Sequence, residues 1–358
     1  MKKKLLIICP YPYDECAGQR FKYENHLEYI KDNGYEITIK TFMSKSFWNI
    51  VYKKGFLFKK IIFTLLGYLQ RIYIIFSLKK YSKIYVFLWI TPFGGSFFER
   101  IYNYFSNNNI IYDIEDNLIN VSDNETRINI KLRSDSKIYY LIKKSKKIIC
   151  STPALENLFK KIRKDNNVYF IPPTLSLRKY IRKNIIETEE ITIGWTGTFS
   201  SMHFLKTIEE TLIKISKIRN IKLVVIGNFI YKNSRMKCRS INWNKENEIT
   251  DLLNFDIGIY PLINDDWIIG KSGLKVMQYM ALGLPSVSSD FGNVKNFIVD
   301  NENGMLAKNE KEWYEKLIYL IDNLNERIRI GKNARETISQ QFSINDIKSK
   351  YLEIINND

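Results

Sequence analysis

The 358-residue sequence has few of the residues that build metal sites and disulfide frameworks. It holds only four cysteines, which are far apart and show neither a CxxC pair nor a zinc-ligand spacing, namely Cys9, Cys16, Cys150 and Cys238. Histidine occurs only twice. These shortages argue against a structural metal site and a disulfide-stapled fold, and they predict free thiols in a reducing compartment.

Long uninterrupted apolar runs are also missing. The longest apolar pieces are broken at Lys59-Lys60, at Gln70-Arg71 and at Lys79-Lys80. A helix that crosses a membrane needs roughly twenty apolar residues without such interruptions. The apolar run that follows the first lysines is likewise too short for a targeting peptide. We therefore expect a cytoplasmic protein.

Acidic residues are absent from residues 37–98, which hold ten Lys or Arg and seventeen aromatic residues. Residues 1–180 contain 31 Lys and Arg against 15 Asp and Glu, whereas residues 181–358 contain 24 against 23. Basic residues among aliphatic and aromatic ones favour contact with an anionic membrane surface, and we assign that contact to Lys53, Lys54, Lys59 and Lys60. A nucleic-acid surface is disfavoured because apolar side chains outnumber polar ones. A buried helix pair with solvated lysines is the other alternative.

Short apolar runs alternate with amphipathic stretches in both halves of the chain. Runs such as KLLIIC and KIYVFLWI in the first half, and ITIGWTGT and IKLVVIGN in the second, are typical of buried parallel strands. A polar stretch over residues 174–190 interrupts the pattern. The sequence therefore predicts an α/β protein of two Rossmann-like domains, 1–180 and 181–340, with a deep cleft between them. Residues 341–358 are predicted to form a helix that crosses back to the first domain.

The letters GKS at Gly270-Lys271-Ser272 raise the question of a phosphate-binding loop. The Walker pattern needs a glycine five residues before Gly270, where this chain has Asp265, so that reading is weak. A strand, a loop and a helix over residues 272–282 are still expected, and the first N–H groups of such a helix, at Ser272 and Gly273, suit a diphosphate. Lys271, Lys275 and Gln278 would share one stripe of that helix. A solvated polar face is the plainer alternative.

Four segments together resemble the retaining glycosyltransferases of family four, which have the GT-B fold. They are residues 256–290 with the block QYMALGLPSV, the following NVKNFIVDNENGMLAKN, residues 193–212, and PYPYDECAGQRFKYE near the amino end. The resemblance covers most of the chain. It implies two facing Rossmann-like domains and transfer of a sugar from a nucleotide-diphosphate sugar without a metal or other cofactor.

The chain departs from the family pattern at two places. The family usually has two glutamates separated by seven residues, where this sequence has Gly270 and Gln278. The family's Arg and Lys after the first donor-domain strand are replaced by a loop with Thr198 and His203. We infer that Lys271 and Lys275 supply the missing positive charge. Gln278 can still donate a hydrogen bond to a ribose hydroxyl.

Further residues are assigned to the site from their place beside these motifs. Gly197 and Thr198 would line the donor site with His203 from the same loop, and the loop that carries Trp243 would bind the base. In the first domain, Gly18 would let the backbone approach the phosphates, with a plain turn glycine as the alternative, and Arg20 would touch phosphate or acceptor. Glu115 and Asp116 stand near the place of the family's His-Asp pair, where one of them would orient or deprotonate the acceptor hydroxyl.

Taken together, the sequence predicts a retaining hexosyltransferase that acts on a lipid-linked or cell-surface glycan at the inner face of the cytoplasmic membrane. Its partners would be a nucleotide sugar, a glycan or glycolipid acceptor and an anionic membrane. One alternative is a sugar-nucleotide epimerase of GT-B fold. Another is a membrane-associated protein that binds nucleotide sugars or glycans with little catalysis. A dinucleotide oxidoreductase is disfavoured because no G-x-G-x-x-G follows the first strand.

Overall fold

The computed structural model describes residues 2–119, 135–265, 268 and 270–357, and these form two compact units. The first unit comprises residues 1–174, 269–272 and 347–358, and the second comprises 175–268 and 273–346. Apart from the short stretch 269–272, the chain passes from the first unit to the second at 174–175 and returns at 346–347. The sequence predicted these two boundaries at 180 and 340. Asp266, Trp267 and Ile269, which belong to the loop predicted before the GKS helix, lie outside the described residues.

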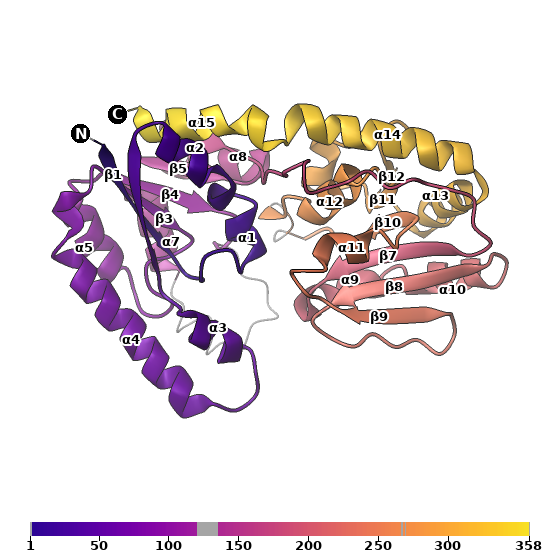
Figure 1. Cartoon of the computed structure of the whole chain (residues 1–358), viewed down its shortest axis with the longest axis horizontal. Helices are drawn as coiled ribbons and strands as arrows, with labels where there is room; N and C mark the ends of the chain where they lie inside the picture. Colours follow the sequence, from indigo (N-terminus) through magenta and orange to yellow (C-terminus); the bar gives the residue numbers. More distant parts are fainter. Residues whose placement is uncertain (1, 120–134, 266–267, 269, 358) are drawn as a thin grey trace. The chain divides into compact units, whose positions relative to one another are not determined.

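The first unit is built on a six-stranded parallel sheet, ordered β2-β1-β3-β4-β5-β6, with helices on both faces (Figure 1). Its strands are β1 (Lys3–Cys9), β2 (Tyr35–Thr41), β3 (Lys83–Phe87), β4 (Ile110–Ile114), β5 (Lys147–Cys150) and β6 (Val168–Phe170). Its α-helices are α1 (Ala17–Arg20), α2 (Leu27–Asp32), α3 (Lys45–Val51), α4 (Leu57–Ile75), α5 (Phe97–Phe105), α7 (Ser136–Lys144), α8 (Pro153–Arg163) and most of α15 (Ile344–Asn356). Short 3₁₀ turns are η1 (Tyr23–His26) and η2 (Leu78–Lys80).

The alternation of side chains along β1 divides the first core in two. Leu6 and Ile8 pack with residues of α5, α7 and α8 on one face of the sheet. Leu5 and Ile7 pack on the other face with α2 and with Tyr351 of α15. Successive residues of a strand point to opposite faces, so a run that is apolar throughout is buried on both sides. The continuous apolar runs of the sequence therefore correspond to central strands covered by two helical layers.

The second unit repeats the architecture with strand order β12-β11-β10-β7-β8-β9, again parallel throughout. Its strands are β7 (Ile191–Gly197), β8 (Ile221–Gly227), β9 (Cys238–Asn242), β10 (Ile257–Tyr260), β11 (Ser286–Ser289) and β12 (Met305–Ala307). Its helices are α9 (Met202–Lys206), α10 (Glu209–Ser216), α11 (Glu248–Leu252), α12 (Leu274–Ala281), α13 (Glu310–Asp322) and α14 (Leu324–Gln341). It also contains the 3₁₀ turns η3 (Phe199–Ser201) and η5 (Asn293–Asn296).

Two doubly wound parallel sheets confirm the predicted fold class. Each sheet has a point where the strand order reverses, beside β1 in the first unit and beside β7 in the second. Connections from the two neighbouring strands leave in opposite directions at such a point, so the backbone opens there and ligands bind at the carboxyl ends. In the second unit this edge carries the loops after β7 and β10. In the first it carries the loop after β1.

Several predicted elements are wrong in detail. Two helical stretches are each divided, since residues 17–32 form α1, η1 and α2, and residues 202–216 form α9 and α10. The GKS helix starts at Leu274 rather than at Ser272, because Gly273 adopts a left-handed conformation with φ +82° just before it. The edge strands β9 and β12 were not predicted. Both are short, and β9 is half exposed, so neither has a long buried apolar run.

The basic, acid-free segment 37–98 forms β2, α3, α4, η2 and β3. Helix α4 runs beside α3 and α5 on one face of the first sheet, and its end nearest α3 projects beyond the strands (Figure 1). A buried helix pair is therefore the wrong description, because most of α4 is exposed. Among the described residues, we find no helix with the length and apolar content needed to cross a membrane.

Candidate functional site

The carboxyl edge of the second sheet brings together two glycines with no room for a side chain. Gly197 ends β7 and pairs in register with Gly227, which ends β8. A Cβ on Gly197 would lie 2.1 Å from the Trp195 ring, and one on Gly227 would lie 2.6 Å from the carbonyl oxygen of Gly197. Bare backbone therefore forms this edge of the sheet. Gly197 was predicted from the sequence, whereas Gly227 was not.

The turn that follows Gly197 is fixed by a capping box. The backbone N–H of Thr198 donates to Ser201 Oγ at 3.0 Å, and both side chains cap the turn η3. Asn228 extends this arrangement, since its Oδ1 accepts a 2.8 Å hydrogen bond from the N–H of Phe199. The loops after β7 and β8 are therefore tied together. Reciprocal capping of this kind satisfies donors that a helical turn would otherwise leave open.

Lys275 lies in the first turn of α12 and reaches this same edge. Its Nζ is 3.3 Å from Ser201 Oγ and 5.0 Å from the centre of the Trp195 ring. Trp195 itself is 1% exposed, so it is a packing residue that holds the lysine by a cation–π contact. The positive charge of Lys275 and the amino end of α12 thus stand beside the turn after β7. This is a suitable environment for a phosphate.

Gln278 is buried one turn further along α12, and its amide Nε2 donates a 2.9 Å hydrogen bond to the hydroxyl of Tyr180. Tyr180 comes from the polar stretch that was predicted as a linker, and it is itself buried. It gave no signal in the sequence, because a lone tyrosine in a polar stretch has no periodic pattern. Gln278 is therefore held by the second unit's own chain.

Lys271 is not part of the α12 stripe, and this prediction is wrong. It precedes the first helical residue by three positions, and the described residues 270–272 are grouped with the first unit. Its Nζ contacts Asp116 Oδ1 at 3.2 Å. The left-handed Gly273 redirects the chain between Lys271 and Lys275. The two lysines consequently serve different units.

Gly270 packs directly on the backbone after β4. A Cβ at this position would lie 2.2 Å from the backbone nitrogen of Asn117 and 3.0 Å from Cα of Asp116. No larger residue fits there without displacing the chain. The glutamate that the family pattern places at this position is thus excluded by local packing. The neighbouring carboxylates come instead from Glu115 and Asp116.

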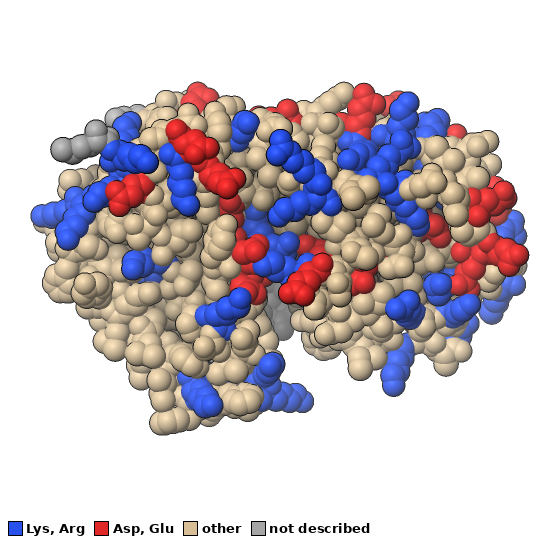
Figure 2. All heavy atoms as spheres, in the orientation of Figure 1, with Lys and Arg blue, Asp and Glu red and all other residues tan. Residues whose placement is uncertain are grey.

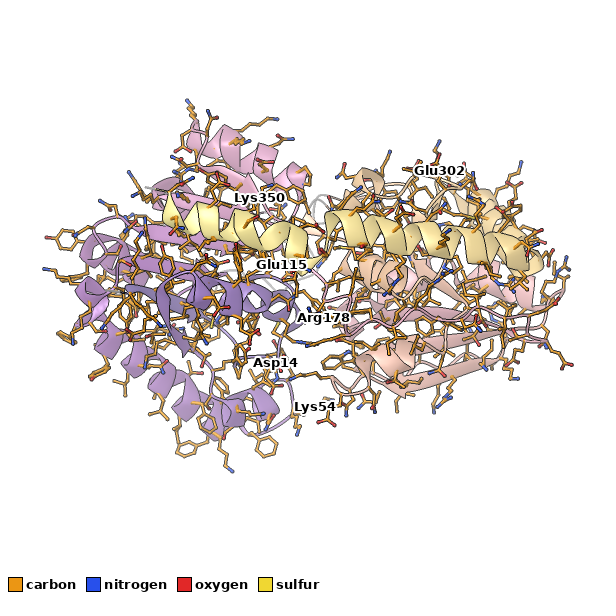
Figure 3. All side chains as sticks on the ribbon, turned by 45° about the horizontal axis from the view of Figure 1, so that its top comes forward. Asp14, Lys54, Glu115, Arg178, Glu302 and Lys350 are labelled. Carbon is orange, nitrogen blue, oxygen red and sulfur yellow. The ribbon has the colours of Figure 1, made fainter. Side chains whose placement is uncertain are left out.

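In the first unit, Glu115, which is labelled in Figure 3, follows the carboxyl end of β4. Its side chain lies against Gly18 of α1. A Cβ on Gly18 would meet Glu115 Oε2 at 1.8 Å. The sequence predicted both residues, with Gly18 assigned to the donor phosphates. The observed contact shows that the missing side chain of Gly18 makes room for this carboxylate.

Burial and the nearby negative charge of Asp116 raise the pKa of Glu115 to about 7, although Lys22 and Lys271 act in the opposite direction. A carboxyl group with a pKa close to neutral exists in both protonation states under ordinary conditions. Such a group is suited to accept or donate a proton. Beneath it, Lys22 and Asp113 form a fully buried ion pair at 2.5 Å, which fixes the end of β4.

The remaining predicted donor residues lie apart from these clusters or are already engaged. Arg20 Nε is 3.5 Å from Asp14 Oδ1, and its guanidinium stacks over Phe21. Trp243 is half-buried, and its backbone N–H donates to the carbonyl of Gly227 at 2.8 Å. His203 is exposed and contacts the ring of Phe204. Ser272 is buried just before α12.

Of the four predicted membrane-binding lysines, Lys53, Lys54 and Lys59 are exposed and Lys60 is half-buried. Lys60 folds back, and its Nζ donates to the carbonyl of Lys53. Lys54 lies in the loop between α3 and α4 (Figure 3). Around that loop the surface carries lysine and arginine without acidic residues (Figure 2).

Residues 178–337 match the family model described as glycosyl transferases group 1. The trehalose synthase of Pyrococcus horikoshii is 33% identical to this chain, over 45% of the chain and 41% of the relative. Two further trehalose synthases are matched over 20% of their length. The chain therefore spans less than half the length of these curated relatives.

Two solved structures resemble the whole chain. A glycosyltransferase from Rickettsia africae superposes with a TM-score of 0.70 at 14% identity, covering 100% of both chains. Anabaena HepE in complex with UDP and glucose superposes with a TM-score of 0.68 at 11% identity, again over 100% of both chains. At these identities the likeness concerns the fold. Residues 178–337 thus resemble the glycosyl transferases group 1, and the chain as a whole has the GT-B fold.

Proposed function

We propose that this protein is a retaining glycosyltransferase that moves a sugar from a nucleotide-diphosphate sugar to a glycan or glycolipid acceptor. The bond between the anomeric carbon and the diphosphate oxygen breaks, and the acceptor oxygen forms a new bond to that carbon on the same face. The diphosphate leaves with both electrons of the broken bond, and the acceptor hydroxyl gives up its proton. The observation that carries the proposal is the family match over residues 178–337. Within this stretch, Lys275 lies at the carboxyl edge of the second sheet, beside Ser201.

The donor side of the proposal rests on charge. The leaving diphosphate develops negative charge, and preorganised cations and N–H donors lower the barrier to its departure. Lys275, held by Trp195 and Ser201, and the first N–H groups of α12 supply this charge in the second unit. We assign the diphosphate to them, with no metal required. UDP in the related Anabaena structure supports a uridine nucleotide as the first donor to test.

The acceptor side rests on Glu115. Its pKa of about 7 lets it accept the acceptor's proton at neutral pH, while Asp116 is held by Lys271. The role of Asp116 is then to raise the pKa of Glu115 by repulsion. General base catalysis of this kind contributes typically about 10²–10⁴ in rate.

We place the acceptor at an anionic membrane surface, on the cytoplasmic face. Support comes from the charge of the first half of the chain, where 31 basic residues stand against 15 acidic ones. Anionic headgroups attract such a surface at about 1 kcal/mol for each lysine or arginine close to it.

A second candidate is a binding protein with little catalysis. It is favoured by Gly270, because the packing against Asn117 leaves no room for the glutamate of the family pattern. Both candidates bind a nucleotide sugar, so binding alone does not separate them.

The test is a panel of UDP-, GDP- and ADP-sugars, each measured for thermal stabilisation, for hydrolysis and for transfer to membrane extracts. Transfer with one donor supports the transferase, and the configuration of the product shows whether it is retained. Stabilisation without hydrolysis or transfer supports the binding protein. An acceptor-independent change of the sugar identifies an epimerase, and no effect of any donor rejects the proposal.

A further inference from the structure

The outward face of α4 is apolar except at Lys59 and Gln70. Among its most exposed side chains, Phe58 and Tyr73 are each 76% exposed, and Phe76, directly after the helix, is 83% exposed. The other large apolar residues exposed on this face are Leu57, Ile61, Ile62, Leu65, Leu66, Leu69 and Ile72. The outward face of a helix on a soluble domain is normally polar. A continuous apolar surface of this kind marks a contact with a partner or a membrane.

The inward face of α4 is firmly packed, so the exposed face does not result from a loosely placed helix. Gly67 sits over Phe42, where a Cβ would come within 2.6 Å of the ring. Arg71 is fully buried and donates to three backbone carbonyls, which belong to Cys9, Lys40 and Ile90. Cys9 is the last residue of β1, Lys40 is the second-last residue of β2, and Ile90 lies shortly after β3. Helix α4 is thereby clamped to the carboxyl edge of the first sheet.

The charges around α4 select an anionic partner. Residues 37–98 contain no Asp or Glu. The exposed lysines cluster at the two ends of the helix, with Lys53, Lys54 and Lys59 before or in its first turn and Lys79 and Lys80 after its last. A second copy of the chain docked on this face would bring lysines close to lysines. A bilayer with anionic headgroups instead offers hydrocarbon to the apolar middle and negative charge to both ends.

We propose that α4 is an interfacial anchor that lies parallel to the surface of an anionic bilayer, with its outward face inserted among the lipid chains. At 1.5 Å per residue the helix presents an apolar strip roughly 28 Å long. Its polar interruptions, Lys59 and Gln70, leave the strip otherwise apolar. Insertion of the strip provides most of the affinity, and the flanking lysines select anionic lipids.

The hydrogen bonds of Arg71 also link α4 to the part of the first unit that we propose contacts the acceptor. The carbonyl of Cys9 immediately precedes the loop that leads to Gly18, and Gly18 lies against Glu115. A bilayer that holds α4 therefore also fixes the direction in which this loop faces the surface. This deepens the membrane part of the proposed function and names the helix that makes the contact.

The experiment is co-sedimentation of the full chain with phosphatidylcholine vesicles, with and without phosphatidylglycerol, in the absence of nucleotide. The wild-type protein should bind the anionic vesicles. Leu65→Gln combined with Leu69→Gln should weaken this binding at least about tenfold, because two apolar side chains lose their burial. The matched control, Ile218→Gln with Ile230→Gln, changes two exposed isoleucines of the second unit and should bind as the wild type does. Equal binding by both double variants overturns the proposal.

Two further measurements keep the test decisive. Hydrogen exchange of residues 57–75 should slow when anionic vesicles are added to the unmodified chain, and unchanged exchange also overturns the proposal. Sedimentation equilibrium without lipid tests whether a second copy of the chain binds this face of α4 instead. A dimer that the Leu65/Leu69 substitutions dissociate, together with absent vesicle binding, would assign the face to a second copy instead. None of these readouts needs catalysis, so a failure here is distinct from a failure of the donor panel.

Discussion

Glu115 occupies the space that the Cβ of any residue other than glycine would take at position 18, with its Oε2 only 1.8 Å from that point. The loop after β1 and the end of β4 thus meet without an intervening side chain. The contact joins two parts of the first unit that are nearly a hundred residues apart in the sequence. It also makes the carboxylate's position sensitive to a single methyl group.

Gly18→Ala should therefore displace Glu115 and lower sugar transfer at least tenfold. The added methyl group forces the carboxylate, the far end of a flexible side chain, to move, so the free energy of unfolding should change little while transfer falls. Steady-state transfer rates and urea unfolding measure the two effects. Gly95→Ala is the matched control, because its Cβ would meet only Ser136 Oγ at 3.7 Å. Full activity of the Gly18 variant would show that the position of Glu115 is not critical.

Lys275→Ala should weaken UDP binding by more than a factor of ten, equivalent to about 1.4 kcal/mol. The substitution removes the charge beside the turn after β7 and the cation–π contact with Trp195. Isothermal titration calorimetry with UDP measures the loss. Lys206→Ala changes an exposed lysine of α9 and should bind UDP normally. If both variants bind equally well, the diphosphate lies elsewhere.

Glu115→Gln should lower the transfer rate by about 10²-fold or more and remove the acidic limb of its pH profile. In the wild-type protein the pKa is about 7, so the carboxylate fraction and the rate both rise as the pH increases through that value. The amide cannot take up a proton, and its residual rate should not change there. Transfer rates of the wild type and the variant, measured from about pH 5 to about pH 9, span roughly two pH units on each side of this pKa and reveal whether the acidic limb is lost. A variant that keeps the wild-type profile would assign the titrating group to another residue.

Glu99→Gln should stabilise the first unit at neutral and alkaline pH. Burial raises the pKa of Glu99 from 4.5 in the unfolded chain to about 7 in the folded protein. The folded state then binds more protons than the unfolded state between these values, so stability falls as the pH rises from 4.5 to 7. The loss is about 3 kcal/mol at most, and the neutral amide avoids it.

Urea unfolding at low and at neutral pH measures how steeply the free energy of unfolding falls with pH in the wild type and in the variant. The exposed Glu28→Gln serves as the control and should leave the pH dependence unchanged. A Glu99 variant with the wild-type slope would show that the carboxyl group does not carry the pH dependence.

The sequence was most informative where one local rule decides the outcome. The apolar runs that became β1, β3, β7 and β8 are buried on both faces, as expected for central parallel strands. The start of α8 also follows a local rule, because Pro153 stands in its first turn and the side chain of Thr152 accepts the N–H of Leu155. The alternation of these elements was enough to predict two doubly wound sheets.

Sequence patterns did not predict the features that depend on contacts between residues far apart in the chain. The strands β9 and β12 exist because they pair with the exposed edges of β8 and β11, which periodicity does not record. Lys271 and Lys275 have helical spacing, yet the left-handed Gly273 separates them. Tyr180 was missed because its role depends on Gln278, almost a hundred residues away.

The sequence by itself determined the two parallel sheets, the charge asymmetry and the acid-free segment, because these follow from the order and type of residues alone. Only the tertiary structure decided which side of α4 remains uncovered, why Gly18 and Gly270 exclude a side chain, and where Glu115 acquires its raised pKa. Each of these depends on the distance between groups that are remote in the chain, since close packing and desolvation act through space.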